Sequence, residues 1–170
     1  MSSQRKLDFS GTVEYKIANA KNVTVHQGTE PLELDGMVTK KLFTKDLSEY
    51  IKGHEKEYYL EYCLREGASV IYSNVLLFVP EKHFAFEDPE IVCEISGADK
   101  KFSMTVTAKK FAKDVEFDFD GVDAVLSDNY INITTSSPLK ITLNVPTGIE
   151  SALHLKKELK VRSIYDVKKS

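Results

Sequence analysis

Apolar and polar residues alternate with a period of two along most of the chain. In residues 11–17, for example, Val13, Tyr15 and Ile17 are separated by charged side chains. Successive side chains of a β-strand point to opposite faces of its sheet, so this pattern predicts a strand with one buried face. The same alternation predicts strands over residues 22–26, 57–64 and 68–79, and the turn signal Arg65-Glu66-Gly67 joins the last two as a hairpin.

The period of two returns after residue 90. It predicts about six or seven short strands, at spacings of roughly 8 to 15 residues, a pattern typical of an immunoglobulin-type β-sandwich. The strands are expected over residues 91–95, 102–106, 115–119, 131–133, 139–145 and 159–161.

Helical signals are few. Residues 44–54 predict one short helix, with Thr44 or Asp46 as its cap and Gly53 as its end. Residues 150–159 are long enough for a helical turn only. Strands and helices do not alternate along the chain, which excludes a catalytic β/α barrel within it.

A proline-bracketed stretch separates the two groups of strands. Pro80 and Pro89 flank it, and proline removes a backbone donor and pushes the preceding residue toward extended conformations. This composition suits a connector, so we expect a domain boundary near residue 86. The predicted fold is all-β, with two consecutive immunoglobulin-like antiparallel β-sandwiches over residues 1–86 and 87–170.

Composition narrows the function classes. The 170 residues carry a formal net charge of −3, without the basic, aromatic-rich stripe of a nucleic-acid binder. No uncharged apolar run is long enough to cross a membrane, and the N-terminus lacks the apolar segment of a signal peptide. Cys63 and Cys93 lie in different predicted domains and are expected to be unpaired thiols. These features slightly favour a cytoplasmic location.

One acidic stretch partly resembles a calcium loop. Glu116, Asp118, Asp120 and Gly121 occupy the first, third, fifth and sixth places of an EF-hand pattern. The twelfth place, which requires a bidentate Glu, is Ser127. Strand alternation already accounts for acids at every second residue, so we expect no calcium site.

No catalytic or cofactor-binding motif stands out. The chain has no GxSxG elbow and no glycine-rich phosphate loop, and acids that alternate along strands would face water. The histidines lack the spacing of a zinc site. These scattered residues are His26, His54, His83 and His154.

A tyrosine-rich strand offers a surface for sugar rings. Tyr58 and Tyr62 share the parity of the leucines on the core side, which leaves Tyr59 as the well-placed outward tyrosine. Tyr72 follows on the next predicted strand. Tryptophan, a frequent sugar-stacking residue, is absent. Tyr59 is therefore the candidate for a weak contact with mannose-containing glycans.

Four segments together resemble a known family. They read SNVLLFVPEKHFAFEDPEI, FAKDVEFDFDG, LSDNYINI and LKKELKVRSIYDV, at residues 73–91, 111–121, 126–133 and 155–167. They resemble the C-terminal region of exo-β-mannosidases of glycoside hydrolase family two. The resemblance implies two immunoglobulin-like sandwiches that follow a catalytic barrel, which would be the partner of this region. The family's catalytic glutamates belong to that barrel, so no catalytic role passes to this chain.

The chain departs from the family at one place. The family strand opened by Ser-Asp-Asn commonly runs into an apolar Leu-Pro-Gly turn, whereas residues 131–140 read INITTSSPLK. The resemblance therefore leaves the turn geometry after this strand open.

The remaining candidate site is the polar segment Ser127-Asp128-Asn129 within VLSDNYINIT, residues 125–134. A catalytic loop, a metal site and a structural corner share such a composition. Asp and Asn tolerate left-handed backbone and bond nearby backbone groups, which suits a chain that crosses between sheets. Tyr130 then resembles the tyrosine corner of an immunoglobulin-like strand, with a buried ring and a hydroxyl that donates to a backbone carbonyl. We expect a structural corner formed by Ser127, Asp128, Asn129 and Tyr130.

The sequence therefore predicts a non-catalytic accessory region of a β-mannosidase-like glycoside hydrolase, without a cofactor or metal. The parent enzyme would remove terminal β-linked mannose by a retaining mechanism. Two other hypotheses stay open, an independent carbohydrate-binding module and an adhesion or interaction domain. Sugar-binding measurements distinguish the first of these from an accessory region.

Overall fold

A computed structural model describes residues 9–34, 43–98, 101–135, 137–145 and 151–168. The first eight residues, which bear on the expected absence of a signal peptide, lie outside this set. The chain divides into two compact units. Unit 1 comprises Met1–Asn19 and Val23–Phe84, and unit 2 comprises Ala20–Asn22 and Ala85–Ser170. In the described residues, no helix has the length and apolar character needed to cross a membrane.

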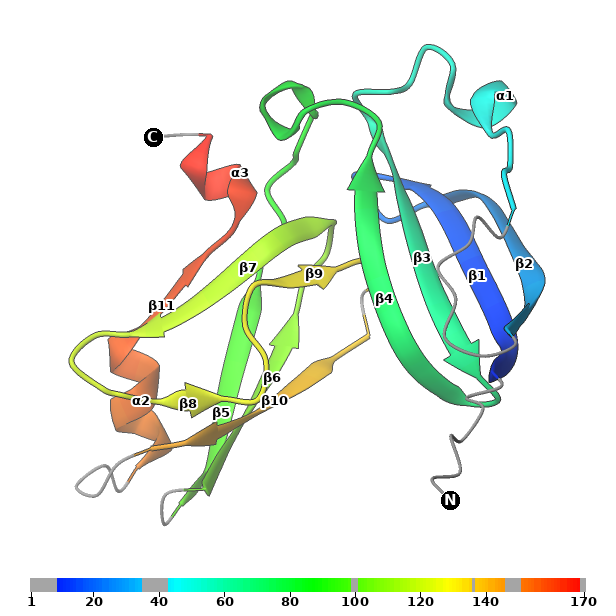
Figure 1. The fold of residues 1–170 in the computed structure, drawn as a ribbon. Coiled ribbons are helices and arrows are strands. Elements are labelled where there is room, and N and C mark those ends of the chain that lie inside the picture. The colour runs from blue at the N-terminus through cyan, green and yellow to red at the C-terminus, as the bar shows by residue number, and fades with distance from the viewer. Residues whose placement is uncertain (1–8, 35–42, 99–100, 136, 146–150, 169–170) are drawn as a thin grey trace, which may run out of the picture. The chain divides into compact units, whose positions relative to one another are not determined.

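The described strands of unit 1 form one antiparallel sheet in the order β2-β1-β3-β4 (Figure 1). Their bounds are Phe9–Asn19 for β1, Thr24–Leu34 for β2, Tyr58–Glu66 for β3 and Ser69–Leu77 for β4. The hairpin predicted from Arg65-Glu66-Gly67 is confirmed, because β3 and β4 pair as antiparallel neighbours.

The two faces of this sheet differ in chemistry. Tyr15 of β1 pairs with Tyr62 of β3, and Leu60 pairs with Leu76 of β4, so these residues share one face. We call it the apolar face. The opposite face carries Glu14, Lys16 and Glu61 and is called the polar face. The alternation in the sequence produces this division directly.

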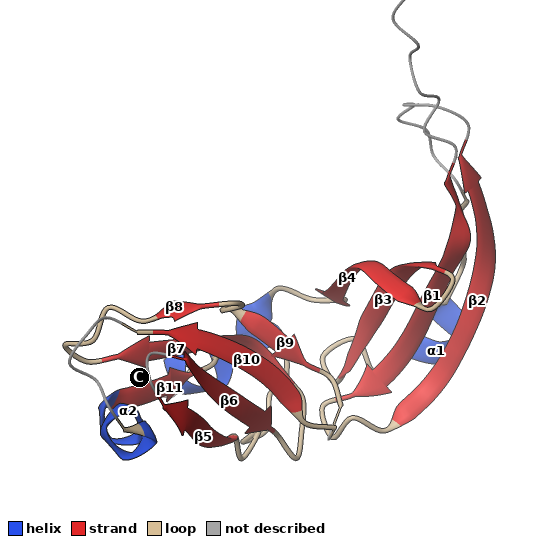
Figure 2. Cartoon of the chain, turned by 90° about the horizontal axis from the view of Figure 1, so that it is seen from below, coloured by secondary structure: helices blue, strands red, loops and turns tan. Residues whose placement is uncertain are grey.

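A short helical segment lies against the apolar face. Helix α1 spans Ser48–Ile51, which is shorter than predicted, and its Tyr50 ring stacks on His26 of β2 with centroids 3.9 Å apart. Figure 2 shows α1 beside β1 and β2. Asp46 does accept a hydrogen bond from the Ser48 N–H at 2.9 Å, although Leu47 is the N-cap residue. A 3₁₀ turn, η1, spans Glu81–His83 after β4.

The described strands of unit 2 form two antiparallel sheets, in the orders β5-β6-β10-β8 and β11-β7-β9. Their apolar faces enclose one core, so this unit is a two-layer sandwich (Figure 1). The strands are β5 Val92–Ala98, β6 Lys101–Thr107, β7 Ala112–Phe119, β8 Val125–Leu126, β9 Ile131–Ile133, β10 Leu139–Asn144 and β11 Leu159–Arg162. The buried core includes Phe102, Met104, Val106, Val115, Phe117, Phe119, Ile133, Ile141, Leu143 and Leu155.

Two short helices are described in the part of unit 2 that the structure covers. Helix α2 spans Ala152–Glu158 and buries Leu155 in the core. Helix α3, Ile164–Val167, was not predicted from the sequence. It begins with a capping box, in which the N–H of buried Ser163 donates to Asp166 Oδ2 at 2.8 Å. The expectation of an all-β antiparallel fold is confirmed, because the helices are minor additions to the sheets.

Candidate functional site

The Ser127–Tyr130 segment connects β8, in one sheet of unit 2, to β9 in the other. The chain therefore crosses between the two layers of the sandwich at this point. The side chains of Ser127 and Asn129 form hydrogen bonds to strands of both sheets.

Two residues anchor the crossing. The Ser127 N–H donates to the Thr142 carbonyl at 2.9 Å, and the Thr142 N–H donates to Ser127 Oγ at 3.0 Å, which ties the segment to β10. On the other side, Asn129 Oδ1 accepts from the Phe117 N–H at 2.8 Å and Asn129 Nδ2 donates to the Phe117 carbonyl at 3.1 Å. The amide of Asn129 thus satisfies both backbone groups of a buried β7 residue, as a paired strand would.

Asp128 has a smaller role. Its Oδ1 accepts from the Asn129 N–H at 3.0 Å, and the residue is exposed. This is a local turn contact, in contrast to the contacts of Ser127 and Asn129 with distant strands.

The expected burial of Tyr130 is wrong. The residue is 62% exposed, and its hydroxyl donates to Glu116 Oε1 at 3.0 Å, whereas a tyrosine corner bonds a backbone carbonyl. Tyr130 lies just before β9, so the alternation of that strand does not set the direction of its ring. The backbone at Tyr130 is left-handed, with φ of 56°, a conformation that non-glycine residues rarely adopt.

We therefore expect Tyr130→Phe to leave the urea midpoint of unit 2 unchanged within error. The hydroxyl it removes is exposed to water, and Glu116 retains its ion pair with Arg162 at 2.9 Å. A measurable loss of stability would show that the phenol contributes to the fold.

The hydrogen bond to Glu116 also raises the pKa of the Tyr130 phenol, so the midpoint of its absorbance titration should lie above that of an ordinary tyrosine.

The expected outward position of Tyr59 is also wrong. The residue has 0% exposure, so its ring offers no surface for a sugar to stack on. Its neighbours explain why, since Tyr59 pairs with Ala18 on β1 and with Leu77 on β4. Ala18, Tyr59 and Leu77 form an apolar row across the three strands, although the row lies on the polar face. Burial raises the pKa of the Tyr59 phenol.

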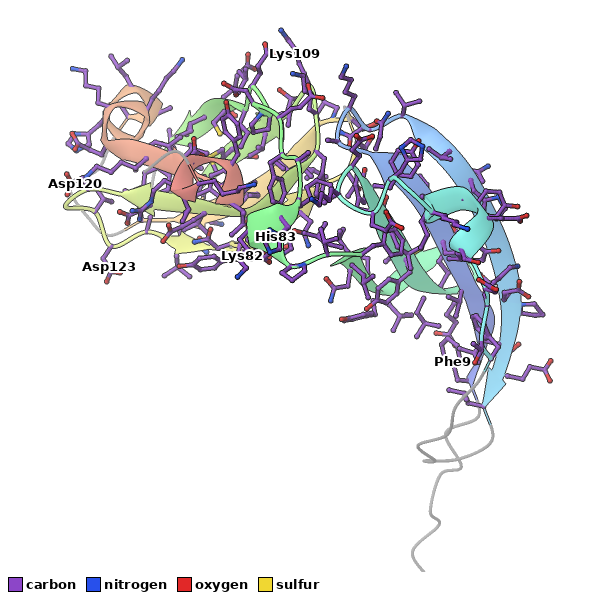
Figure 3. All side chains as sticks on the ribbon, turned by 90° about the horizontal axis from the view of Figure 1, so that it is seen from above. Phe9, Lys82, His83, Lys109, Asp120 and Asp123 are labelled. Carbon is purple, nitrogen blue, oxygen red and sulfur yellow. The ribbon has the colours of Figure 1, made fainter. Side chains whose placement is uncertain are left out.

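Two acids of the calcium-like stretch, Glu116 and Asp120, form ion pairs with cationic side chains. Asp120 bonds Lys160 at 2.8 Å, a contact that lowers the pKa of the Asp120 carboxyl. Figure 3 labels Asp120 and Asp123 in the turn after β7, where they do not point toward one another. Over the described ranges of the chain, no group of three or more His, Cys, Asp or Glu residues could hold a metal ion. The absence of a calcium site in solution stays a prediction.

The two cysteines are free thiols in different units. Burial raises the pKa of Cys93 to about 11 and also raises the pKa of Cys63. Both thiols are therefore neutral at physiological pH.

The polar face of unit 1 has a hollow of about 470 Å³, which we call the sheet hollow. Sequence reasoning did not identify it, although the alternating charges of β1 and β3 indicate the face on which it lies. Its lining includes two ion pairs, Lys16 to Glu61 at 2.6 Å and Arg65 to Glu14 at 2.8 Å. Its lining residues are Glu14, Tyr15, Lys16, Gln27, Gly28, Thr29, Glu61, Tyr62, Cys63 and Arg65.

Family models match the chain almost from end to end. A mannosidase Ig/CBM-like domain matches residues 1–83, and an Ig-fold domain of the mannosidase type matches residues 86–167. The chain belongs to the mannosidase immunoglobulin-like domains. The chain therefore consists of two Ig-like domains in tandem, as the sequence predicted. No curated protein matched the sequence of the chain.

Solved structures contain the same fold within longer chains. A β-D-mannosidase from Dictyoglomus thermophilum matches with a TM-score of 0.67 and 15% identity, over 92% of this chain and 18% of that one. An exo-chitosanase from Amycolatopsis orientalis matches with a TM-score of 0.51 and 14% identity, over 95% and 23%. The chain therefore spans less than a quarter of the length of either hydrolase.

Proposed function

We propose that the chain is the accessory region of a β-mannosidase-like glycoside hydrolase, and that it packs against and steadies the catalytic barrel of its parent. The two mannosidase-type family matches and the hydrolase neighbours support this proposal. We propose domain limits of 1–86 and 87–170. The parent would be a retaining exo-β-mannosidase.

The exposed end of the apolar face in unit 1 supports the packing role. Tyr72 and Leu76 of β4 lie on this face and are 51% and 46% exposed. Tyr72 is ordered by its ring contact with Tyr62, 6.2 Å between centroids, and by a hydrogen bond from Asn74 at 2.9 Å. Asn74 lies between Tyr72 and Leu76 on the strand, and exposed apolar side chains gathered on one sheet face mark surfaces that bind other protein. We assign this surface to the parent hydrolase.

The proposal predicts the effect of Leu76→Asp in the full-length parent. The variant should lose activity on an aryl β-mannoside at a lower temperature than the wild type, because a carboxylate would be buried at the packed surface. Below that temperature kcat/KM should be unchanged, since the substitution lies outside the catalytic barrel. The 170-residue chain alone should hydrolyse no aryl β-mannoside above background.

Val92→Asp is the matched control. Val92 of β5 is 53% exposed, and the next outward residue of its strand is the exposed Glu94. This substitution should leave the thermal inactivation of the parent unchanged, and both variants should leave the urea midpoint of the isolated chain unchanged. Equal inactivation of the two parent variants would contradict the packing role. A coding sequence without a barrel upstream of Met1 would contradict the assignment of the parent.

A further inference from the structure

The sheet hollow is assembled from two neighbouring rows of the polar face. One row contains Thr29, Glu14 and Cys63, and the other contains Gln27, Lys16 and Glu61. Each row takes one residue from β2, one from β1 and one from β3. Side chains paired across adjacent strands lie about 4.5 to 5.5 Å apart, so the two rows form a compact grid of polar groups. Arg65 pairs with Thr12 in the next row, and its side chain contacts Glu14 of the first row.

The charges of the hollow cancel. Lys16 neutralises Glu61, and Arg65 neutralises Glu14. The Cys63 thiol donates to Glu14 Oε2 at 3.6 Å, and its raised pKa keeps it uncharged. An anion would meet two carboxylates here and a cation would meet two cationic side chains. The electrostatics therefore favour a neutral ligand over an ion of either sign.

The edge strand β2 contributes polar groups that are available to a ligand. Gln27 and Thr29 are exposed, and neither side chain forms a hydrogen bond or ion pair with the residues that the structure describes. Their amide and hydroxyl groups can both donate and accept. A ligand can thus bond to them without separating either ion pair.

The hollow lacks an apolar wall. Tyr15 and Tyr62 line it, but their side chains point to the apolar face, since they alternate with the polar residues of the grid. The Tyr15 ring covers its paired residue Gly28, because a Cβ at Gly28 would lie 2.2 Å from the Tyr15 hydroxyl oxygen. A hydrophobic ligand would therefore find only polar side chains and backbone.

We propose that the sheet hollow binds a neutral, hydroxyl-rich ligand of the class of a short oligosaccharide. Sugar hydroxyls donate and accept at once, which matches a grid of paired carboxylates and cations flanked by an amide and a hydroxyl. Binding is weak, with a millimolar Kd, because the hollow is open and has no aromatic surface for stacking. This site is separate from the packing surface, which lies on the other face of the sheet.

The test is an NMR titration of the isolated 170-residue chain with β-1,4-mannobiose and with cellobiose, and with inorganic phosphate as the charged probe. At least one disaccharide should shift the backbone amides of residues 14–16, 27–29 and 61–65 in a saturable way, and phosphate should not. The disaccharide that binds should also slow the alkylation of Cys63 in a Cys93→Ser background. The experiment needs no catalytic domain, so its failure would leave the accessory role intact.

A double variant and a matched control locate the site. Gln27→Ala combined with Thr29→Val should weaken disaccharide binding by about fivefold or more, the effect of about one lost hydrogen bond. Both positions are exposed, so the urea midpoint should be unchanged. Ser73→Ala lies on the same face on β4, outside the hollow, and should bind like the wild type. Shifts centred elsewhere, an unaffected double variant, saturable phosphate binding or no saturable disaccharide binding would each overturn the proposal.

Discussion

Leu155→Ala is expected to destabilise unit 2 by about 2 to 5 kcal/mol, the largest effect that we predict for a single substitution. Leu155 is the fully buried residue of α2, with 0% exposure, and its side chain belongs to the core between the two sheets. Removing three carbons leaves a cavity that the surrounding strands cannot fill completely. The loss combines the transfer free energy of those atoms with the cost of that cavity.

Leu153→Ala is the matched control for this experiment. Leu153 lies two residues away on the same helix and is 65% exposed, and the substitution changes helix propensity in the same way. Its effect should stay within about 0.5 kcal/mol. Urea unfolding should be followed by the amide signals of β6, since a chain with two units need not unfold in one transition. Similar midpoint shifts for the two variants would show that α2 does not pack as described.

Asn129→Ala is expected to cost about 2 to 4 kcal/mol, because it removes three hydrogen bonds, two with Phe117 and one from the Tyr130 N–H. The N–H and carbonyl of buried Phe117 then lose the partner that Asn129 provides. Asp128→Ala, the adjacent control, removes one exposed turn contact and should cost less than about 1 kcal/mol. The measurement is the urea midpoint at unchanged slope, read from the amide signals of β7 and β9.

The pair of variants separates a structural corner from a functional loop. A structural corner requires the loss at Asn129 to exceed the loss at Asp128, since only Asn129 bonds the neighbouring strand. If Asp128→Ala left stability unchanged but abolished the activity of a full-length parent enzyme, the Ser127–Tyr130 segment would instead be a functional loop. The structural interpretation would then be wrong.

Much of the fold was predictable because its determinants are local. Alternation over a few residues fixes which side chains of a strand share a face, so the strands around Tyr15, Val115 and Ile141 were found from the sequence. The two-residue strand β8 is too short to show any period, and it was missed. Helix α3 was missed for the same reason, since its four residues contain barely one turn.

The candidate sites depended on partners that are distant in the sequence. The periodicity correctly assigned Tyr59 to the polar face of β3, but the apolar character of its row comes from Ala18 and Leu77 on other strands. The sheet hollow likewise requires β2, β1 and β3 to pair in one particular register. Pattern reasoning gives the face of each strand, whereas register across strands decides which side chains meet.

The sequence by itself determined the all-β class, the two groups of strands, the hairpin after Arg65 and the polar composition of the corner. Only the tertiary structure decided what that corner does. Asn129 acts through Phe117, twelve residues away on another strand, and Tyr130 points to water beside Glu116. The physical reason is that alternation is a property of one strand, whereas burial and hydrogen bonding belong to the whole set of strands that surround a residue.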